Sequence, residues 1–242
     1  MVEWVTRAGL GELTEEFCRR LAEVTVAAGA IPVALTGGRS AGIFYDAWVA
    51  QGVNARMEFY WSDERLVPDN DTDSNVKLGR ERLLLPGKVG EEGIHAPRTA
   101  LAGTACAADY AASIRLAVPP GKTGIPSFPL IILGMGADGH TGSLFPGRNP
   151  FEEQEKLVRA VEAAQAHPHA RITFTPELIN AAQRVWFVIT GAAKAWAVEQ
   201  LVRRTATPEQ IPALAVDPGA VGITIFADEG STGGQDYGVI GT

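Results

Sequence analysis

The chain has 242 residues, 46% of them hydrophobic and 20% charged, a composition that is typical of folded globular proteins and excludes disordered and fibrous classes. Lys and Arg number 21 against 28 Asp and Glu, which gives a formal charge of -7 and argues against nucleic acid or an anionic membrane surface as a partner. Any anionic ligand would therefore have to be bound by a local basic site.

Short apolar runs rich in strand-forming residues alternate along the chain with segments whose apolar residues recur at helical spacing. The expected strands span residues 31–35, 57–61, 130–133, 185–189 and 221–226. The expected helices span residues 13–28, 40–51, 75–85, 104–117 and 192–203. This alternation predicts one α/β domain over residues 1–242, with a mainly parallel sheet flanked by helices. The Gly-rich tail, residues 229–242, is assigned no chemistry.

Sequence features of secreted and membrane proteins are missing. The two cysteines, Cys18 and Cys106, have no Cys or His nearby at metal-ligand spacing, which argues against a disulfide framework. The apolar stretches end well before about 18 residues, and the first residues resemble no signal peptide. We expect a cytoplasmic protein without a membrane partner.

Unusual residues cluster where four of the expected strands end. In open parallel sheets, ligands bind outside the carboxyl ends of the strands, where the following loops converge. We therefore expect one crevice bordered by four loops. These are Thr36-Gly37-Gly38-Arg39-Ser40, Ser62-Asp63-Glu64-Arg65, Gly134-Met135-Gly136-Ala137-Asp138-Gly139-His140 and Thr190-Gly191-Ala192-Ala193-Lys194.

The first loop, residues 36–40, allows three interpretations. Its glycines lie between a strand and a helix, so its backbone N–H groups could bind a phosphate, or the glycines could serve the turn alone. The third interpretation is a G-x-S-x-G nucleophile elbow at Ser40, with Asp63 and His140 downstream as in serine hydrolases. Against it, only 39 residues precede Ser40, and most of them look helical.

The third loop contains a literal G-x-G-x-x-G, from Gly134 to Gly139, which is the pattern of dinucleotide-binding proteins. That function needs a helix directly after the last glycine, whereas Pro146 and Pro150 interrupt the following residues. His140 ends the loop. Because the imidazole pKa of about 6.5 suits proton transfer near neutrality, His140 is the best candidate for a general base.

The remaining charged and histidine residues are ambiguous when taken singly. Arg171 and Lys194 could each bind a phosphate, or could be solvated surface charges. Asp63-Glu64-Arg65 could be an internal cluster of ion pairs. His95, His167 and His169 are expected to be structural. The last two could bind a metal ion as a pair, but no third ligand is spaced with them, so no metal is expected.

Several runs resemble the 6-phosphogluconolactonase family over roughly residues 30 to 200. They are Tyr60-Trp61-Ser62-Asp63-Glu64-Arg65-Leu66-Val67-Pro68, Asp73-Ser74-Asn75, Leu133-Gly134-Met135-Gly136-Ala137-Asp138-Gly139-His140-Thr141-Gly142-Ser143-Leu144-Phe145-Pro146-Gly147 and Arg171-Ile172-Thr173-Phe174-Thr175 with Ile179-Asn180. The resemblance implies a Rossmann-like α/β fold. It also implies hydrolysis of 6-phospho-D-glucono-1,5-lactone in the oxidative pentose phosphate pathway, without a metal or organic cofactor.

The resemblance also implies roles for individual residues. His140 would be the base, and Arg65 would lie near the lactone. As our own hypothesis beside the resemblance, Asp138 or a loop carbonyl would orient the His140 ring, and Arg65 or loop N–H groups would stabilise the oxyanion. Asp63 would either orient the substrate or only hold Arg65. The phosphate would contact the first loop and two basic residues, which are Thr36, Gly37, Gly38, Arg39, Ser40, Arg171 and Lys194. One departure is that Ala41 stands where the family more often has a helix-starting proline.

Two relatives by fold remain as alternatives. Glucosamine-6-phosphate deaminase resembles this chain in its glycine loop and its Asp-Gly-His segment, but carries Asn-Glu-Pro where this chain has Leu144-Phe145-Pro146, so the ring-opening glutamate is missing. A sugar-phosphate sensor would need a DNA-binding module, and the roughly 30 residues before the first loop do not accommodate one. We expect a monomer or small homo-oligomer that binds a sugar-phosphate lactone.

Overall fold

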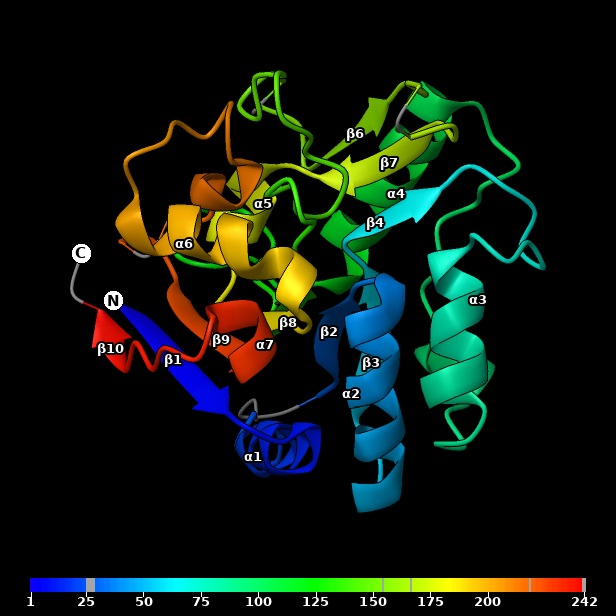
Figure 1. The fold of residues 1–242 in the computed structure, drawn as a ribbon. Helices are drawn as coiled ribbons and strands as arrows, with labels where there is room; N and C mark the ends of the chain where they lie inside the picture. Colours follow the sequence, from blue (N-terminus) through cyan, green and yellow to red (C-terminus); the bar gives the residue numbers. More distant parts are fainter. Residues whose placement is uncertain (25–28, 154, 166, 218, 241–242) are drawn as a thin grey trace.

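The computed structural model describes residues 1–24, 29–153, 155–165, 167–217 and 219–240, and within them the chain forms a seven-stranded sheet in the order β10-β1-β9-β8-β5-β2-β3 (Figure 1). Neighbouring strands pair in parallel, except that β10 runs antiparallel to β1. The strands are β1 (Val2–Arg7), β2 (Ile31–Leu35), β3 (Met57–Trp61), β5 (Leu130–Leu133), β8 (Arg184–Ile189), β9 (Gly222–Asp228) and β10 (Val239–Ile240). The expected α/β fold with a mainly parallel sheet is confirmed.

All five expected strands are present. β2, β3 and β5 begin and end at the predicted residues, and β8 and β9 differ by one or two residues at their ends. Every residue of β2 and β5 is buried, because helices cover both faces of the sheet, and such strands read as continuous apolar runs. Successive residues of β5 face opposite cores, Leu130 and Ile132 one and Ile131 and Leu133 the other.

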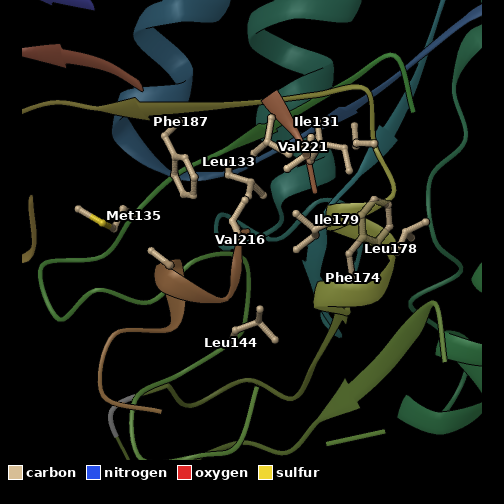
Figure 2. Packing of buried hydrophobic residues seen from close by; sticks show 14 of the residues in the cluster. Ile131, Leu133, Met135, Leu144, Phe174, Leu178, Ile179, Phe187, Val216 and Val221 are labelled. Carbon is tan, nitrogen blue, oxygen red and sulfur yellow. The ribbon is translucent and has the colours of Figure 1, made fainter. Parts of the chain in front are cut away.

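Helices form a layer on each face of this sheet. One core includes buried residues of α1, α2 and η1, and the other includes buried residues of α4, α5, α6 and η4. Figure 2 shows part of the second core, where Leu178 and Ile179 of α5 lie near Ile131 and Val221. The helices are α1 (Leu10–Leu21), α2 (Gly38–Gln51), α3 (Asn75–Gly79), η1 (Arg80–Leu84), η2 (Glu91–Gly93), α4 (Gly103–Ala117), α5 (Pro176–Asn180), η3 (Ala192–Lys194), α6 (Ala195–Arg203), η4 (Pro212–Ala215) and α7 (Glu229–Thr232).

The five expected helices are also present, with changes at their ends. The first was predicted over residues 13–28 but spans Leu10–Leu21; its residues 25–28 lie outside the described part of the chain. The helix predicted over 75–85 is α3 followed by the π-helical turn η1, and the one over 192–203 is η3 followed by α6. None of the helices in the described ranges is long and apolar enough to cross a membrane.

A second, antiparallel sheet of three strands was not predicted. Its order is β4-β7-β6, formed by β4 (Asp63–Arg65), β7 (Arg171–Phe174) and β6 (Val158–Val161). β4 is short and entirely charged, so no apolar alternation marks it, although its residues are largely buried. This sheet lies beside the carboxyl ends of β2 and β3 (Figure 1) and pairs Arg65 with Arg171.

The two ends of the chain also pair in a way that the sequence analysis missed. β1 lies between β9 and β10, so a strand precedes α1 in residues that were expected to be mostly helical. The Gly-rich tail contains α7 and β10, whereas residues 241–242 lie outside the described part. Trp4 of β1 packs against Tyr237 with ring centroids 4.9 Å apart.

The aromatic core beneath α1 gives a test of this packing. Phe17 is fully buried, and its ring lies 4.9 to 5.3 Å from the rings of Phe44, Phe226 and Trp186. Phe17→Ala should lower the free energy of unfolding by about 3–5 kcal/mol in urea titrations, because it leaves a cavity. Leu10→Ala, at an exposed position of the same helix, should change it by less than about 0.5 kcal/mol. Equal effects would contradict this assignment of the core.

Candidate functional site

A cleft of about 470 Å³ opens at the carboxyl edge of the central sheet, and residues from all four predicted loops line it. Thr36 follows β2, Gly134 follows β5 and Thr190 follows β8. Every predicted site residue except Asp138 lines the cleft: Thr36, Gly37, Gly38, Arg39, Ser40, Asp63, Arg65, His140, Arg171 and Lys194. The parallel order of the strands therefore brings together residues that are far apart in the sequence.

The first loop leads directly into α2, even though the family's helix-starting proline is absent. Gly38 has φ +89°, which favours glycine. A Cβ at Gly37 would lie 1.8 Å from Oδ1 of Asn75, so that position also requires glycine. The hydroxyl of Tyr45 donates to the carbonyl of Thr36 at 2.7 Å and accepts from its N–H at 3.1 Å. Among the described residues, no side chain caps the N-terminus of the 14-residue helix α2, so its first N–H groups are available to a ligand.

Ser40 is not paired with a histidine. Its hydroxyl forms a hydrogen bond of 2.8 Å with the hydroxyl of Thr190, and the Nδ1 atom of His140 is bonded to Asp138 instead. A serine nucleophile needs an adjacent base. The described residues around Ser40 therefore do not form the triad that the G-x-S-x-G pattern allowed.

The third loop folds tightly around the His140–Asp138 pair. Nδ1 of His140 lies 2.6 Å from Oδ1 of Asp138, which also accepts the backbone N–H of His140 at 3.1 Å. The N–H of Gly136 donates to the carbonyl of His140, and a Cβ at Gly136 would lie 2.1 Å from Nδ1. Residues 140–150 contain no helix, as expected from Pro146 and Pro150, so the glycines serve this close approach.

The Asp138 carboxylate is the electrostatic partner of His140. Burial raises the pKa of Asp138, but the hydrogen bonds and charge of His140 outweigh this effect and lower the pKa to about 2. Since Nδ1 is engaged by Asp138, Nε2 is the nitrogen of His140 that remains for other partners. A histidine oriented in this way by a carboxylate can accept or donate a proton at Nε2.

Asp63 does not hold Arg65. Oδ2 of Asp63 accepts a hydrogen bond of 2.7 Å from Ser143 and lies 3.9 Å from Nη1 of Arg171, and the side chain of Asn75 donates to Asp63 as well. Arg65 donates instead to the carbonyl of Asp73. The internal ion-pair cluster considered from the sequence is therefore absent from these described residues.

Glu64 is a buried carboxylate that the sequence suggested only as part of a possible ion-pair cluster. It is 0% exposed and accepts hydrogen bonds from the backbone N–H groups of Arg65, Asn75 and Val76, at 2.6 to 2.8 Å, and from the hydroxyl of Ser74 at 3.0 Å. Burial raises its pKa above the usual value, and the three backbone donors offset only part of this rise. Its position after β3, in a loop expected to border the crevice, was the feature of the sequence that could have pointed to Glu64. Only the fold shows which groups it contacts.

Four cationic side chains, Arg39, Arg65, Arg171 and Lys194, line the cleft of this acidic protein. Burial lowers the pKa of Lys194. Burial and then the charge of Arg65 lower the pKa of Arg171. The side chain of Arg171 is 9% exposed, and its Nε has no hydrogen-bond partner among the described residues. A buried guanidinium with unused donors is suited to binding an anion.

Comparisons with known proteins agree on one family. A model of that family, described as glucosamine-6-phosphate isomerases/6-phosphogluconolactonase, matches residues 7–225. The 6-phosphogluconolactonase of Rattus norvegicus is 37% identical over 175 residues, which are 72% of this chain and 66% of that protein. The chloroplastic 6-phosphogluconolactonase 3 of Arabidopsis thaliana is 34% identical over 204 residues, 80% of this chain. The chain spans about 61% of the length of that plant relative.

Solved structures show the same architecture. The 6-phosphogluconolactonase of Trypanosoma brucei superimposes with a TM-score of 0.84 at 25% identity, covering 98% of this chain and 99% of that one. The corresponding protein of Leishmania guyanensis has a TM-score of 0.85 at 21% identity, with 98% and 100% covered. The fold described above is therefore shared over nearly the whole chain.

The Asp138–His140 contact predicts a specific titration. In the parent protein the carboxyl carbon signal of Asp138 should move only slightly between pH 5 and 3, because its pKa is about 2. In His140→Ala the side-chain hydrogen bond and the charge of His140 are lost while burial remains, so the pKa of Asp138 should rise and the signal should titrate in this range. Carbon-13 NMR measures both.

The same contact predicts how stability depends on pH. Since the pKa of Asp138 is lower in the folded than in the unfolded protein, ionised Asp138 stabilises the fold above about pH 4, and this contribution is lost as the pH falls toward 2.

For the carbon-13 titration, His169→Ala is the matched control, because His169 bonds to Asp73 and its loss should leave the Asp138 signal unchanged. An Asp138 signal that titrates identically in the parent and His140→Ala would contradict the contact.

Proposed function

Because the chain belongs to the family of glucosamine-6-phosphate isomerases and 6-phosphogluconolactonases, we propose that it hydrolyses 6-phospho-D-glucono-1,5-lactone to 6-phosphogluconate, in the oxidative pentose phosphate pathway. The observation that carries this proposal is the cleft itself. It combines a carboxylate-oriented histidine with a helix N-terminus and several cations, in a chain with a net charge of -7. The relatives reported above that are named for lactonase activity support the same reaction.

The phosphate would bind at the first loop. The free N–H groups at the start of α2 and the positive end of the helix dipole favour an anion there. Arg171 offers a planar pair of donors, and Lys194 a point charge. Thr36, Arg39 and Ser40 belong to the same loop and also line the cleft, and their polar groups would complete this binding site. Fixing the phosphate would position the lactone carbonyl at the other end of the cleft.

His140 would act at the lactone carbonyl. Nε2 takes a proton from a water molecule as the water oxygen attacks C1, and Asp138 stabilises the imidazolium that forms. Arg65 stabilises the negative charge on the former carbonyl oxygen. When the bond between C1 and the ring oxygen breaks, His140 returns the proton to that oxygen, and the acid is released. Asp63, whose carboxylate accepts a hydrogen bond from Ser143, would orient the sugar hydroxyls.

The deaminase alternative is less well supported by the cleft. Ring opening by that enzyme would use the glutamate of its Asn-Glu-Pro segment, and this chain has Leu144 and Phe145 there. Both are buried, with exposed fractions of 1% and 6%, so the segment contributes to packing and offers no carboxylate. Ammonia release from glucosamine 6-phosphate at an enzymatic rate would favour the deaminase over our proposal.

Other properties expected from the sequence stay predictions. They are a cytoplasmic location, activity without a cofactor, and a monomer or small homo-oligomer. The plant relative, in contrast, is named chloroplastic.

The proposed base is tested by an assay with freshly generated 6-phosphogluconolactone, corrected for spontaneous hydrolysis. The parent protein should accelerate hydrolysis. His140→Ala should lower kcat by about 10² to 10⁴ with little change in KM, the usual range for losing general acid–base assistance. Ser40→Ala should cost much less. If Ser40→Ala abolished turnover while His140→Ala did not, a serine nucleophile would replace this mechanism.

The proposed phosphate contact is tested by comparing two substrates. Arg171→Ala removes a charge-assisted contact of about 1.5 to 3 kcal/mol, which should lower kcat/KM for the phosphorylated lactone roughly ten- to a hundredfold. The slower hydrolysis of unphosphorylated gluconolactone should be almost unchanged in Arg171→Ala and should fall in His140→Ala. An equal loss for both substrates in a folded Arg171→Ala protein would remove Arg171 from the phosphate site.

A further inference from the structure

A group of three metal-ligating side chains forms where the loop after β5 meets the connection between β6 and β7. Asp138, His140 and His167 each offer one ligand atom, and these atoms all lie within 4.8 Å of one another. The spacing of His167 and His169 in the sequence suggested no third ligand. The fold instead separates that pair, because Nε2 of His169 bonds to Asp73 at 2.9 Å, and places His167 beside His140.

His167 is held in this position by packing and by backbone pairing. Its ring stacks on Phe145, with centroids 3.8 Å apart and an interplanar angle of 17°. It meets the His140 ring edge-on at 5.5 Å. The N–H and carbonyl of His167 exchange hydrogen bonds with Ala164 at 2.8 and 2.9 Å. Among the described residues, no hydrogen bond reaches the ring nitrogens of His167, so they are free to bind a ligand.

The composition and spacing of the group suit zinc. Two imidazoles and a carboxylate are ligands that Zn²⁺ prefers, whereas Ca²⁺ and Mg²⁺ prefer oxygen alone. Tetrahedral zinc with bonds of about 2.0–2.2 Å places its ligand atoms roughly 3.3–3.5 Å apart. The side chains must therefore shift by about an ångström. Those of Asp138 and His140 are 46% and 29% exposed, which leaves room for that shift and for entry of the ion.

We propose that Asp138, His140 and His167 form a zinc site, and that Zn²⁺ bound there inhibits the enzyme. Three protein ligands leave the fourth coordination position to water. The ion would displace the hydrogen bond between Asp138 and His140 and would coordinate both side chains. His140 could then no longer be oriented by Asp138 to accept a proton from water. The inhibitory half of the proposal rests on the proposed role of His140 as base, whereas zinc binding does not.

Binding is tested by calorimetry with Zn²⁺ on chelator-treated, dialysed protein. The parent should bind one ion per chain at this site, and His167→Ala should weaken the affinity by at least about tenfold, because it removes a ligand. His167→Phe should do the same while keeping a ring against Phe145. His169→Ala is the matched control and should bind like the parent. Unchanged zinc affinity in folded His167→Ala and His167→Phe would overturn the site.

Inhibition is tested with the same proteins in the lactone assay. After chelator treatment the parent, His167→Ala and His169→Ala should hydrolyse the lactone at similar rates. Added Zn²⁺ should inhibit the parent and His169→Ala but not His167→Ala, and Mg²⁺ should have no such effect. Zinc that binds but leaves the rate unchanged, or raises it, would overturn the inhibition. A metal-free parent without lactonase activity would contradict only the proposed function, because calorimetry decides the site.

Discussion

The carboxylate of Glu64 is completely buried in β4, and its hydrogen bonds join the small antiparallel sheet to the start of α3. Burying a carboxylate without partners would cost several kcal/mol or more, so this charge is tolerated only because three backbone N–H groups and the Ser74 hydroxyl converge on it. The same hydrogen bonds fix Asn75, which contacts Asp63 and packs under Gly37. One side of the cleft therefore depends on a single buried charge.

Close approach of backbone to side chain shapes the other side. At Gly37 and at Gly136 a Cβ would collide with Asn75 and with the His140–Asp138 pair, respectively. These two glycines belong to the loops that the sequence marked as phosphate-binding or dinucleotide-binding patterns. In this fold the missing Cβ of each glycine leaves room for a side chain to lie against the loop backbone. The loop patterns therefore indicated where the site is, and the contacts explain why glycine is needed there.

Charge separates the cleft from the rest of the molecule. The chain is acidic overall, yet four cations line the cleft, and the buried Arg171 lies 3.9 Å from the carboxylate of Asp63. Beside His140, Asp138 and His167 add a carboxylate and an imidazole that could bind a metal ion. We therefore expect the cleft to bind anions at its basic end, and to be sensitive to zinc beside its proposed base.

The sequence by itself determined the layers of the fold and the edge of the sheet that carries the site. β2 and β5 are predictable to the residue because a strand buried on both faces is apolar throughout. β3 is predictable as well, although it contains Glu58. The residues that follow parallel strands must meet at one edge of the sheet. Only the tertiary structure decided the pairing of β4 with β7, the burial of Glu64 and the meeting of His140 with His167. These depend on partners that are distant in the chain, and β4 is stabilised by buried polar contacts that leave no periodic apolar pattern to read.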